Sequence, residues 1–379
     1  MNERLFTDFE VQSPEAWKDK LVSDLKGKPF EDLLWENQGL SGKPFYTKED
    51  LPSTLPPLGK IHANPEAFGN RYWANYQHVI VNSTKEANER ALLALESGAD
   101  GLLFELQKLT DLTILLQGIQ VQYCQVSFLS NNLSTEDIFT AYANYLSAAN
   151  IDKEKVNGFI DGIGYQFQKE IKGLKTVVLK TNKKTNHSAQ QIALILAEII
   201  DLIDVENIAP IDFFNMLSTE ITLSSDYFSE IAKLRALRFS IQKLAGAYGI
   251  TIDDPITISR TPDWSSAIDD PHSFMLHATT QAMAAIIGGT DGLIVHPFYK
   301  VFGKNHSLAE RMARNISTIL KEESYLAKNI DPSAGSYYLE STTKDLTTNA
   351  IELLKTIEQK GGLSKLDVDL FIDSKTETP

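Results

Sequence analysis

Residues 279 to 293 read Thr-Thr-Gln-Ala-Met-Ala-Ala-Ile-Ile-Gly-Gly-Thr-Asp-Gly-Leu and say most about how this chain folds. The small and apolar residues that lead to Gly288 predict a helix, and the two adjacent glycines suit its carboxyl end. The apolar run Leu293-Ile294-Val295 follows at once and predicts a short buried strand. A helix that leads directly into a short buried strand is typical of folds in which strands and helices alternate.

The same alternation extends over most of the chain, from about Tyr72 to Gly362. The expected strands are 77–81, 101–105, 123–128, 158–162, 176–180, 212–217, 256–260 and 292–296. The expected helices between them include 84–97, 135–148, 189–203, 225–248 and 308–321. Eight strands that alternate with amphipathic helices predict a closed (β/α)₈ barrel, the TIM-barrel fold. An open doubly wound sheet is the alternative, and the absence of a Gly-x-Gly-x-x-Gly turn after an early strand disfavours its dinucleotide-binding form.

The first sixty residues predict an extended N-terminal arm instead of a domain. Ser13-Pro14 is a helix start, because serine suits the N-cap and proline the first helical position. The proline-rich stretch 51–57 predicts an extended connector. The arm carries apolar residues with few regular elements to bury them: Phe6, Phe9, Trp17, Leu33, Leu34 and Trp35. We therefore divide the chain into an arm (1–60), a barrel (61–362) and a polar C-terminal tail (363–379).

The composition excludes several classes of partner. The chain has 36 basic and 50 acidic residues, a net charge of −14, which disfavours binding to nucleic acid or to an anionic membrane surface. The single cysteine, Cys124, excludes an intrachain disulfide, and its apolar strand predicts a buried, inert thiol. No signal peptide and no apolar run long enough to span a membrane are apparent, so a cytoplasmic location is expected.

Several further blocks follow one another along the chain. They are Trp17-Lys-Asp-Lys-Leu-Val-Ser-Asp-Leu-Lys-Gly27, Asn207-Ile-Ala-Pro-Ile-Asp-Phe-Phe214, Arg260-Thr-Pro-Asp-Trp-Ser265, Glu310-Arg-Met-Ala-Arg-Asn315 and Asp331-Pro-Ser-Ala-Gly-Ser-Tyr-Tyr-Leu-Glu340. Together with the stretch 279–293, this succession resembles the substrate-binding barrel of methylmalonyl-CoA mutase. The resemblance implies an isomerase complex that interconverts methylmalonyl-CoA and succinyl-CoA with adenosylcobalamin.

The resemblance also marks four positions of the substrate pocket where this chain departs from the family. The tyrosine of the family's Thr-Met-Tyr-x-x-Arg-Pro-Trp falls on Phe68, in Glu66-Ala-Phe-Gly-Asn-Arg-Tyr-Trp73. The histidine that hydrogen-bonds the thioester carbonyl falls on Lys180. A glutamine near the substrate falls on Arg260, and the last histidine of Gly-Gly-Thr-Gln-Ser-Leu-His falls on Ile294. Phe68, and Leu179 beside Lys180, supply no hydrogen-bond donor, so we interpret the four positions as degenerate and expect no catalytic residue in this chain.

The sequence contains no convincing motif for binding a metal or a cofactor. Asp270-Pro-His272-Ser-Phe-Met275 approaches the cobalt-binding Asp-x-His-x-x-Gly, but Met275 replaces the glycine, and aspartate before proline is an ordinary helix start. His187, His277 and His296 are too scattered to predict a metal site. The lysine-rich loop 180–184 predicts a solvated loop, or a phosphate-facing one at the rim of the barrel.

We therefore expect the small, non-catalytic subunit of a heterodimeric methylmalonyl-CoA mutase, with bulky side chains filling the barrel. The large catalytic subunit would be its partner and would hold the adenosylcobalamin, and this chain is not expected to bind acyl-CoA. Two alternatives stay open. One is an active mutase barrel that uses a cobalamin domain on a separate chain, and the other is a free-standing binding or regulatory protein.

Overall fold

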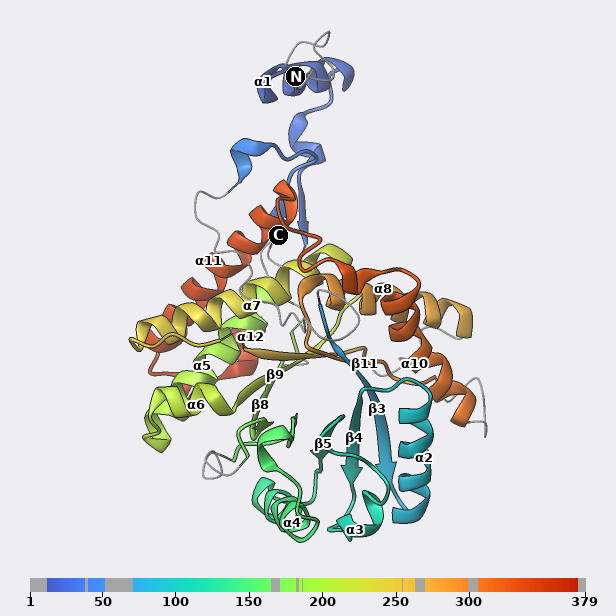
Figure 1. Cartoon of the computed structure of the whole chain (residues 1–379). Coiled ribbons are helices and arrows are strands. Elements are labelled where there is room, and N and C mark those ends of the chain that lie inside the picture. The colour runs from blue at the N-terminus through green and yellow to red at the C-terminus, as the bar shows by residue number, and fades with distance from the viewer. Residues whose placement is uncertain are drawn as a thin grey trace, which may run out of the picture.

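The computed structural model of the chain describes residues 12–37, 40–51, 71–164, 171–181, 184–185, 187–253, 255–262, 270–298 and 306–373. Parallel strands form a curved sheet that helices cover on its outer side (Figure 1). The order of the seven strands in this sheet is β5-β4-β3-β11-β10-β9-β8. Their bounds are Ala74–Val81 (β3), Gly101–Leu106 (β4), Gln125–Leu129 (β5), Val177–Lys180 (β8), Leu217–Thr222 (β9), Ile256–Arg260 (β10) and Gly292–Ile294 (β11).

The two edges of this sheet meet through a further pair of short strands. Strand β6 (Gly158–Phe159) pairs with β7 (Leu174–Lys175), which directly precedes β8. On its other side the β6 segment bonds to β5, because the amide of Val126 donates to the carbonyl of Asn157 at 3.0 Å and Phe128 bridges to Ile160. The sheet is therefore curled into a TIM-barrel-like fold, as the alternating pattern predicts.

The helices follow the strands in the expected order. The main ones are α2 (Thr84–Glu96), α3 (Leu112–Leu115), α4 (Thr135–Ala148), α5 (Ser188–Glu206), α7 (Tyr227–Ala247), α8 (Pro271–Gly288), α10 (His306–Glu322) and α11 (Tyr337–Gln359). The long helix α11 packs on α5 and α7, and this layer encloses the largest apolar cluster of the chain. Gly289 ends α8 with φ of 100°, a left-handed conformation that glycine adopts without strain. None of the helices in the described ranges combines the length and the apolar character that crossing a bilayer requires.

One predicted strand is wrong. Residues 212–217 belong largely to helix α6 (Pro210–Met216), and the strand of this unit, β9, begins where that helix ends. The apolar run Phe213-Phe214 resembles a buried strand, but Pro210 at the helix start signals a helix. In the true strand, Leu-Ser-Thr-Glu-Ile-Thr, Ser218 and Glu220 are level with Ile256 and Ile258 on the inside of the barrel, whereas Leu217 and Ile221 pack in the outer apolar cluster.

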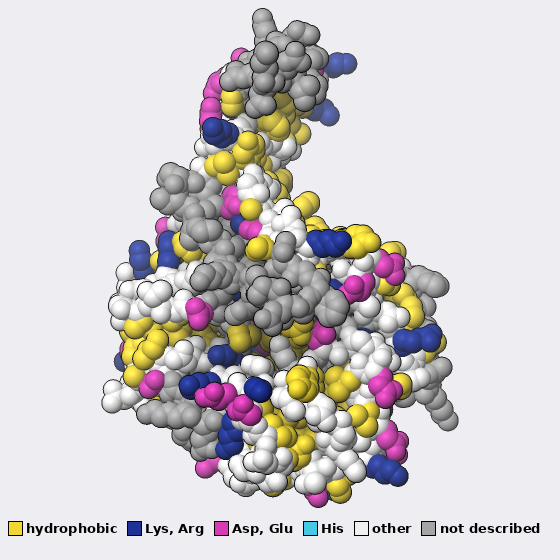
Figure 2. All heavy atoms as spheres, viewed as in Figure 1, with side chains coloured by type: hydrophobic (Ala, Val, Ile, Leu, Met, Phe, Trp, Pro, Cys, Tyr) yellow, Lys and Arg dark blue, Asp and Glu magenta, His cyan; other side chains and the backbone are white. Residues whose placement is uncertain are grey.

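The arm projects from the barrel (Figures 1 and 2). Its helix α1 (Pro14–Asp24) begins as predicted, with Ser13 Oγ accepting from the amide of Ala16. No side chain of α1 is buried, and Trp17 stacks on Phe45 of the same arm at 4.2 Å between ring centroids. Nearer the barrel the arm forms the short hairpin β1–β2 (Trp35–Asn37 and Leu40–Gly42) and is attached to α11, where Trp35 contacts Tyr338 edge-on. Phe6 and Phe9 lie outside the described residues.

The C-terminal segment is more ordered than the predicted polar tail. After Gly361 and Gly362, which follow α11 with positive φ, the chain forms a helical turn (Leu363–Lys365) and helix α12 (Val368–Asp373). Phe371 and Ile372 of this helix are buried in the large apolar cluster. The described residues that follow α11 therefore pack on the barrel through these two apolar side chains.

Candidate functional site

The inner face of the barrel is set by strand register, because register partners in a parallel sheet point to the same side. Tyr76 is level with Gly101 on one neighbour and with Ile294 on the other. A Cβ on Gly101 would lie 2.8 Å from the Tyr76 ring, so the ring occupies space that a side chain on β4 would otherwise fill. The barrel interior is filled by one apolar cluster, made of Ala74, Tyr76, Leu103, Phe159, Val178, Ile258 and Ile294. Of the described interior positions, those level with this cluster are therefore occupied by packed side chains.

Toward the carboxyl ends of the strands the interior becomes charged. Arg260, the last residue of β10, donates from Nε to Glu220 Oε1 at 3.1 Å and from Nη2 to Glu220 Oε2 at 2.9 Å. Lys180, the last residue of β8, pairs with Asp161 beyond β6. These two pairs span four of the strand units, and Glu220 stands level with Lys180 in the register. Each cation of this group is therefore already matched by a carboxylate of this chain.

Histidines extend the same group across the barrel. His78 Nε2 lies 2.9 Å from Glu105 Oε2, and the His78 ring meets the His296 ring edge-on. The hydrogen bond from His78 lowers the pKa of Glu105 most, against an opposing effect of burial, and Arg260 adds to the lowering. Burial opposes ionisation of Glu220 most strongly, but Arg260, Lys180 and His296 outweigh it, so the pKa of Glu220 is lowered. We call these seven side chains the mouth network: His78, Glu105, Asp161, Lys180, Glu220, Arg260 and His296.

Three of the four predicted pocket positions can be placed. Lys180 and Arg260 belong to the mouth network, and Ile294 is fully buried in the apolar cluster beneath it. Phe68 lies outside the described residues, although Arg71 and Trp73 of the same block are described and buried. The structure therefore brings Lys180 and Arg260 to the same end of the barrel, where Glu220 is level with Lys180 and bonded to Arg260.

Sequence reasoning missed the partners of these residues. Glu220 was hidden by the misplaced strand, and Asp161, Glu105 and His78 belong to strands distant in sequence. Alternation along the strands would have marked His78, Glu105 and Glu220 as inward-facing, because every second residue of a barrel strand points inward, but it does not tell which residues pair.

Other family-like blocks lie away from the mouth and stabilise the scaffold. Arg235 of α7 donates from Nη1 to both carboxylate oxygens of Asp331 at 2.7 Å and from Nη2 to Glu340 Oε1 at 2.9 Å. Arg238, one turn later, bonds Asp291 at 2.6 Å. The stretch Asp331 to Glu340 and the glycine-rich stretch before Asp291 are thus tied to α7 by buried charged pairs.

Metal ligation is not supported by the described residues. Asp270 is the N-cap of α8, and its carboxylate accepts from the amide and the hydroxyl of Ser273, both at 2.8 Å. This confirms the helix-start interpretation of the block that approaches a cobalt-binding motif. Within the described part of the chain, no three histidine, cysteine or acidic side chains are placed to hold a metal ion. The aspartate of this block, which the cobalt-binding motif would use to orient its histidine, is instead bonded to Ser273 as a helix cap.

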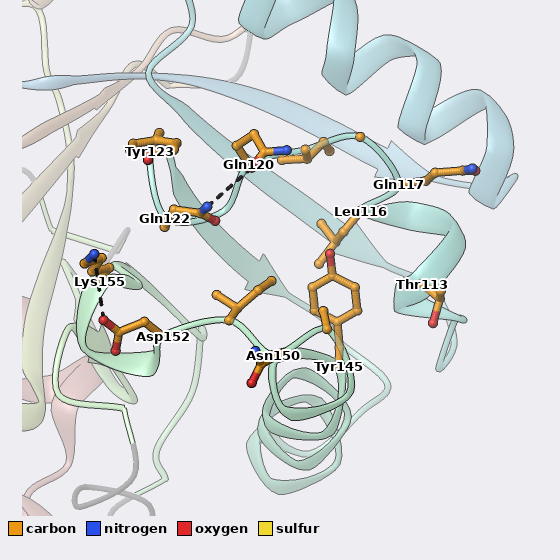
Figure 3. Close-up of a pocket in the computed structure, with 14 residues that line it drawn as sticks. Thr113, Leu116, Gln117, Gln120, Gln122, Tyr123, Tyr145, Asn150, Asp152 and Lys155 are labelled. Carbon is orange, nitrogen blue, oxygen red and sulfur yellow. Dashed lines mark hydrogen bonds and ion pairs between the residues drawn. The ribbon is translucent and has the colours of Figure 1, made fainter.

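Cavities occur at the opposite end of the barrel. One of ≈ 200 Å³ opens among the amino ends of the strands, with Tyr76 and Phe159 in its wall and Lys175 and Gln125 beside them. A second of ≈ 510 Å³ lies on the surface between the loop 116–123 and the end of α4, with both amide and apolar side chains in its wall (Figure 3). Cys124 lies near this groove, half-buried and directly before β5, and burial raises the pKa of its thiol to about 11.

The sequence of this chain is similar to those of methylmalonyl-CoA mutases. A family model described as methylmalonyl-CoA mutase matches residues 182–367. The methylmalonyl-CoA mutase small subunit of Porphyromonas gingivalis is 29% identical over 404 residues, covering 96% of this chain and 65% of the relative. The human mitochondrial methylmalonyl-CoA mutase is 26% identical over 440 residues, covering 96% of this chain and 57% of the relative. The chain thus spans less than two thirds of the length of these relatives.

Proposed function

Because this chain belongs to the methylmalonyl-CoA mutase family, we propose that it is the small, non-catalytic subunit of a heterodimeric mutase. In this proposal a larger partner subunit performs the interconversion of methylmalonyl-CoA and succinyl-CoA, and the complex resides in the cytoplasm. The observation that carries the proposal is the mouth network, in which Arg260 is bonded at two points to Glu220 and Lys180 is paired with Asp161.

The chemistry explains why this observation matters. A radical rearrangement of a thioester needs hydrogen-bond donors that point at the substrate carbonyl, in a site closed to water. Here the donors of Arg260 and Lys180 point at carboxylates of the chain itself. To release Arg260 would leave Glu220 unpaired where it is 6% exposed, which carries a large desolvation cost. The mouth network thus acts as a closed set of charges instead of a binding pocket.

Adenosylcobalamin, which supplies the radical when bound, belongs to the partner in this proposal. In support of this, Asp270, which the cobalt-binding motif would use to orient its histidine, serves as a helix cap. This chain's own contribution is then structural. Its barrel presents a folded surface to the partner, and it is not proposed to bind acyl-CoA.

The arm is the proposed contact with the partner. Phe45 is 43% exposed although it stacks on Trp17, and the two rings line a surface groove of ≈ 560 Å³ together with Pro14. Figure 2 shows apolar side chains along the projecting arm. Apolar surface that a chain leaves uncovered on a projecting segment generally marks an interaction site. A stable interface between subunits would bury on the order of 2,000 Å² or more.

Association can be tested with a truncation whose boundary the structure supplies. Removal of residues 1 to 29 deletes α1 but leaves Trp35, whose ring packs against Tyr338 of the barrel. The truncated and intact chains are each co-expressed with the mutase large subunit of the source cell and purified through a tag on the large subunit. We expect the intact chain to co-purify and the truncated chain to be lost while it remains folded by circular dichroism.

Point variants separate the arm from the rest of the surface. W17A/F45A should weaken association, whereas L276A, which changes a leucine on α8 that is 69% exposed, should not. If the intact chain elutes as a monomer and captures no large subunit, the small-subunit proposal fails. If both truncated and intact chains bind equally, the arm is not the contact.

A further inference from the structure

Arg71 stands at the entrance to the first barrel strand, and its charged group is sealed inside the protein. The residue is 2% exposed, and its amide donates to the carbonyl of Ala327 at 3.0 Å, which fixes its backbone against the turn after α10. Its side-chain nitrogens Nε, Nη1 and Nη2 are all buried, and they have no hydrogen-bond partner in the part of the chain that the structure describes. A buried guanidinium without acceptors is costly, so this residue needs a specific physical account.

The neighbouring carboxylates do not satisfy Arg71, because other groups occupy them. Asp331 accepts from Arg235 through both oxygens and from the amide of Ser333. Asp291 accepts from Arg238 and from the amide of Thr257 at 2.7 Å. These acids influence Arg71 through space, but their positions around Arg235 and Arg238 are fixed by bonds of their own.

The electrostatic environment keeps the group charged without pairing it. Burial lowers the pKa of Arg71 most, Arg238 lowers it further, Asp291 and Asp331 raise it, and the result is about 10. At neutral pH the guanidinium therefore carries its full charge beside a second arginine. The hydroxyl of Ser333, two residues after Asp331, is also buried without a partner among the described residues.

We infer that Arg71 forms a buried binding site for a small oxyanion. The planar fork of a guanidinium presents parallel N–H groups that match two oxygens of a carboxylate or a phosphate. An oxyanion would satisfy these donors and screen Arg71 from Arg238. The site lies at the amino end of β3, far along the strand from the mouth network, and does not rest on the small-subunit proposal.

The test measures anion-dependent stability of the whole chain. The protein is dialysed into a buffer without oxyanions, and its unfolding temperature is followed during titration with acetate, inorganic phosphate or chloride at constant ionic strength. A ligand that binds only the folded state raises the unfolding temperature with the logarithm of its concentration. We expect acetate or phosphate, but not chloride, to give this rise, and the active salt distinguishes the two oxyanion sources.

Two variants assign the effect to a residue. R71M removes the guanidinium but keeps a stem of similar length and should abolish the rise. R311M removes an exposed arginine of α10, changes the net charge equally and should retain the rise. An equal rise in the unmodified chain and in R71M, or no rise with either oxyanion, would overturn the inference.

A second measurement does not depend on whether R71M folds. Crystals of the unmodified chain are grown with selenate, an oxyanion whose anomalous scattering locates it directly. An anomalous peak at the Arg71 guanidinium is expected. Peaks at surface lysines alone would mean an adventitious ion only, and ordered water bonded to Arg71 in the same maps would contradict the inference.

Discussion

Arg260 on β10 and Glu220 on β9 form a two-point ion pair inside the barrel, with nitrogen–oxygen distances of 3.1 and 2.9 Å. On the other neighbouring strand, β11, the residue level with Arg260 is Ile294, which is fully buried. Both positions lie where the family resemblance places substrate contacts. One is now held by a salt bridge and the other by apolar packing, so this region is built for stability of the barrel.

The first prediction concerns the energetic role of this pair. R260M should lower the free energy of unfolding by about 3–5 kcal/mol, because it leaves the Glu220 carboxylate buried without its partner. The double variant R260M/E220M removes both charges and should recover most of that loss. Urea unfolding of the wild type, both single variants and the double variant gives the coupling. Additive losses in the double variant would show that the two side chains do not support each other.

The pair also predicts how stability depends on pH. The pKa of Glu220 is lowered in the folded state, so its carboxylate contributes stability that is present above the ordinary glutamate value of 4.5 and is lost as pH falls below it. E220Q should flatten the acid limb of a plot of unfolding free energy against pH. A plot for E220Q that is parallel to that of the wild type from pH 7 to pH 3 would be inconsistent with this role.

The pKa of Glu198 is shifted in the opposite direction to that of Glu220. Burial, and then Asp201, raises the pKa of Glu198, so its ionised form is disfavoured in the folded chain. E198Q should therefore stabilise the protein at pH 7, on the order of 1 kcal/mol, with a smaller effect at acid pH where the carboxyl is protonated. Unfolding measured at pH 7 and pH 4 compares the two. A loss of stability at pH 7 would be the contradictory result.

Because side chains fill the barrel interior, a larger residue in place of Gly101 should destabilise the protein. G101A places a methyl group 2.8 Å from the Tyr76 ring and should cost about 1–3 kcal/mol, since the packed barrel has no room to yield. G246A in α7 has open space around the new methyl group and should be stabilising by up to about 1 kcal/mol. The two unfolding temperatures should therefore move in opposite directions. A neutral G101A would mean that the ring of Tyr76 does not pack there.

Much of the architecture can be predicted from the sequence because apolar residues recur at different spacings in strands and in helices. Seven of the eight expected strands coincide with observed ones, and the eighth failed where the apolar Phe213-Phe214 run is helical. The true strand β9 carries Ser218 and Glu220 toward the interior, and a polar interior removes the hydrophobic signal of a buried strand.

The site itself was less predictable. Lys180 and Arg260 could be identified from the sequence because recognisable blocks flank them. Their acidic partners could not, since a salt bridge between strands depends on register and on which face each residue occupies. The arm was foreseen as a separate segment, but its attachment through Trp35 and Tyr338 joins residues about three hundred positions apart.

We propose that this chain preserves the mutase barrel without its chemistry, and one assay tests this most directly. The pure chain is incubated with adenosylcobalamin and methylmalonyl-CoA, alone and with the purified large subunit, and succinyl-CoA is measured by chromatography. We predict no product above the no-enzyme control for the chain alone and turnover only when the large subunit is present. Enzyme-like formation of succinyl-CoA by the chain alone would contradict the account, because it would require the mouth network to open into a working site.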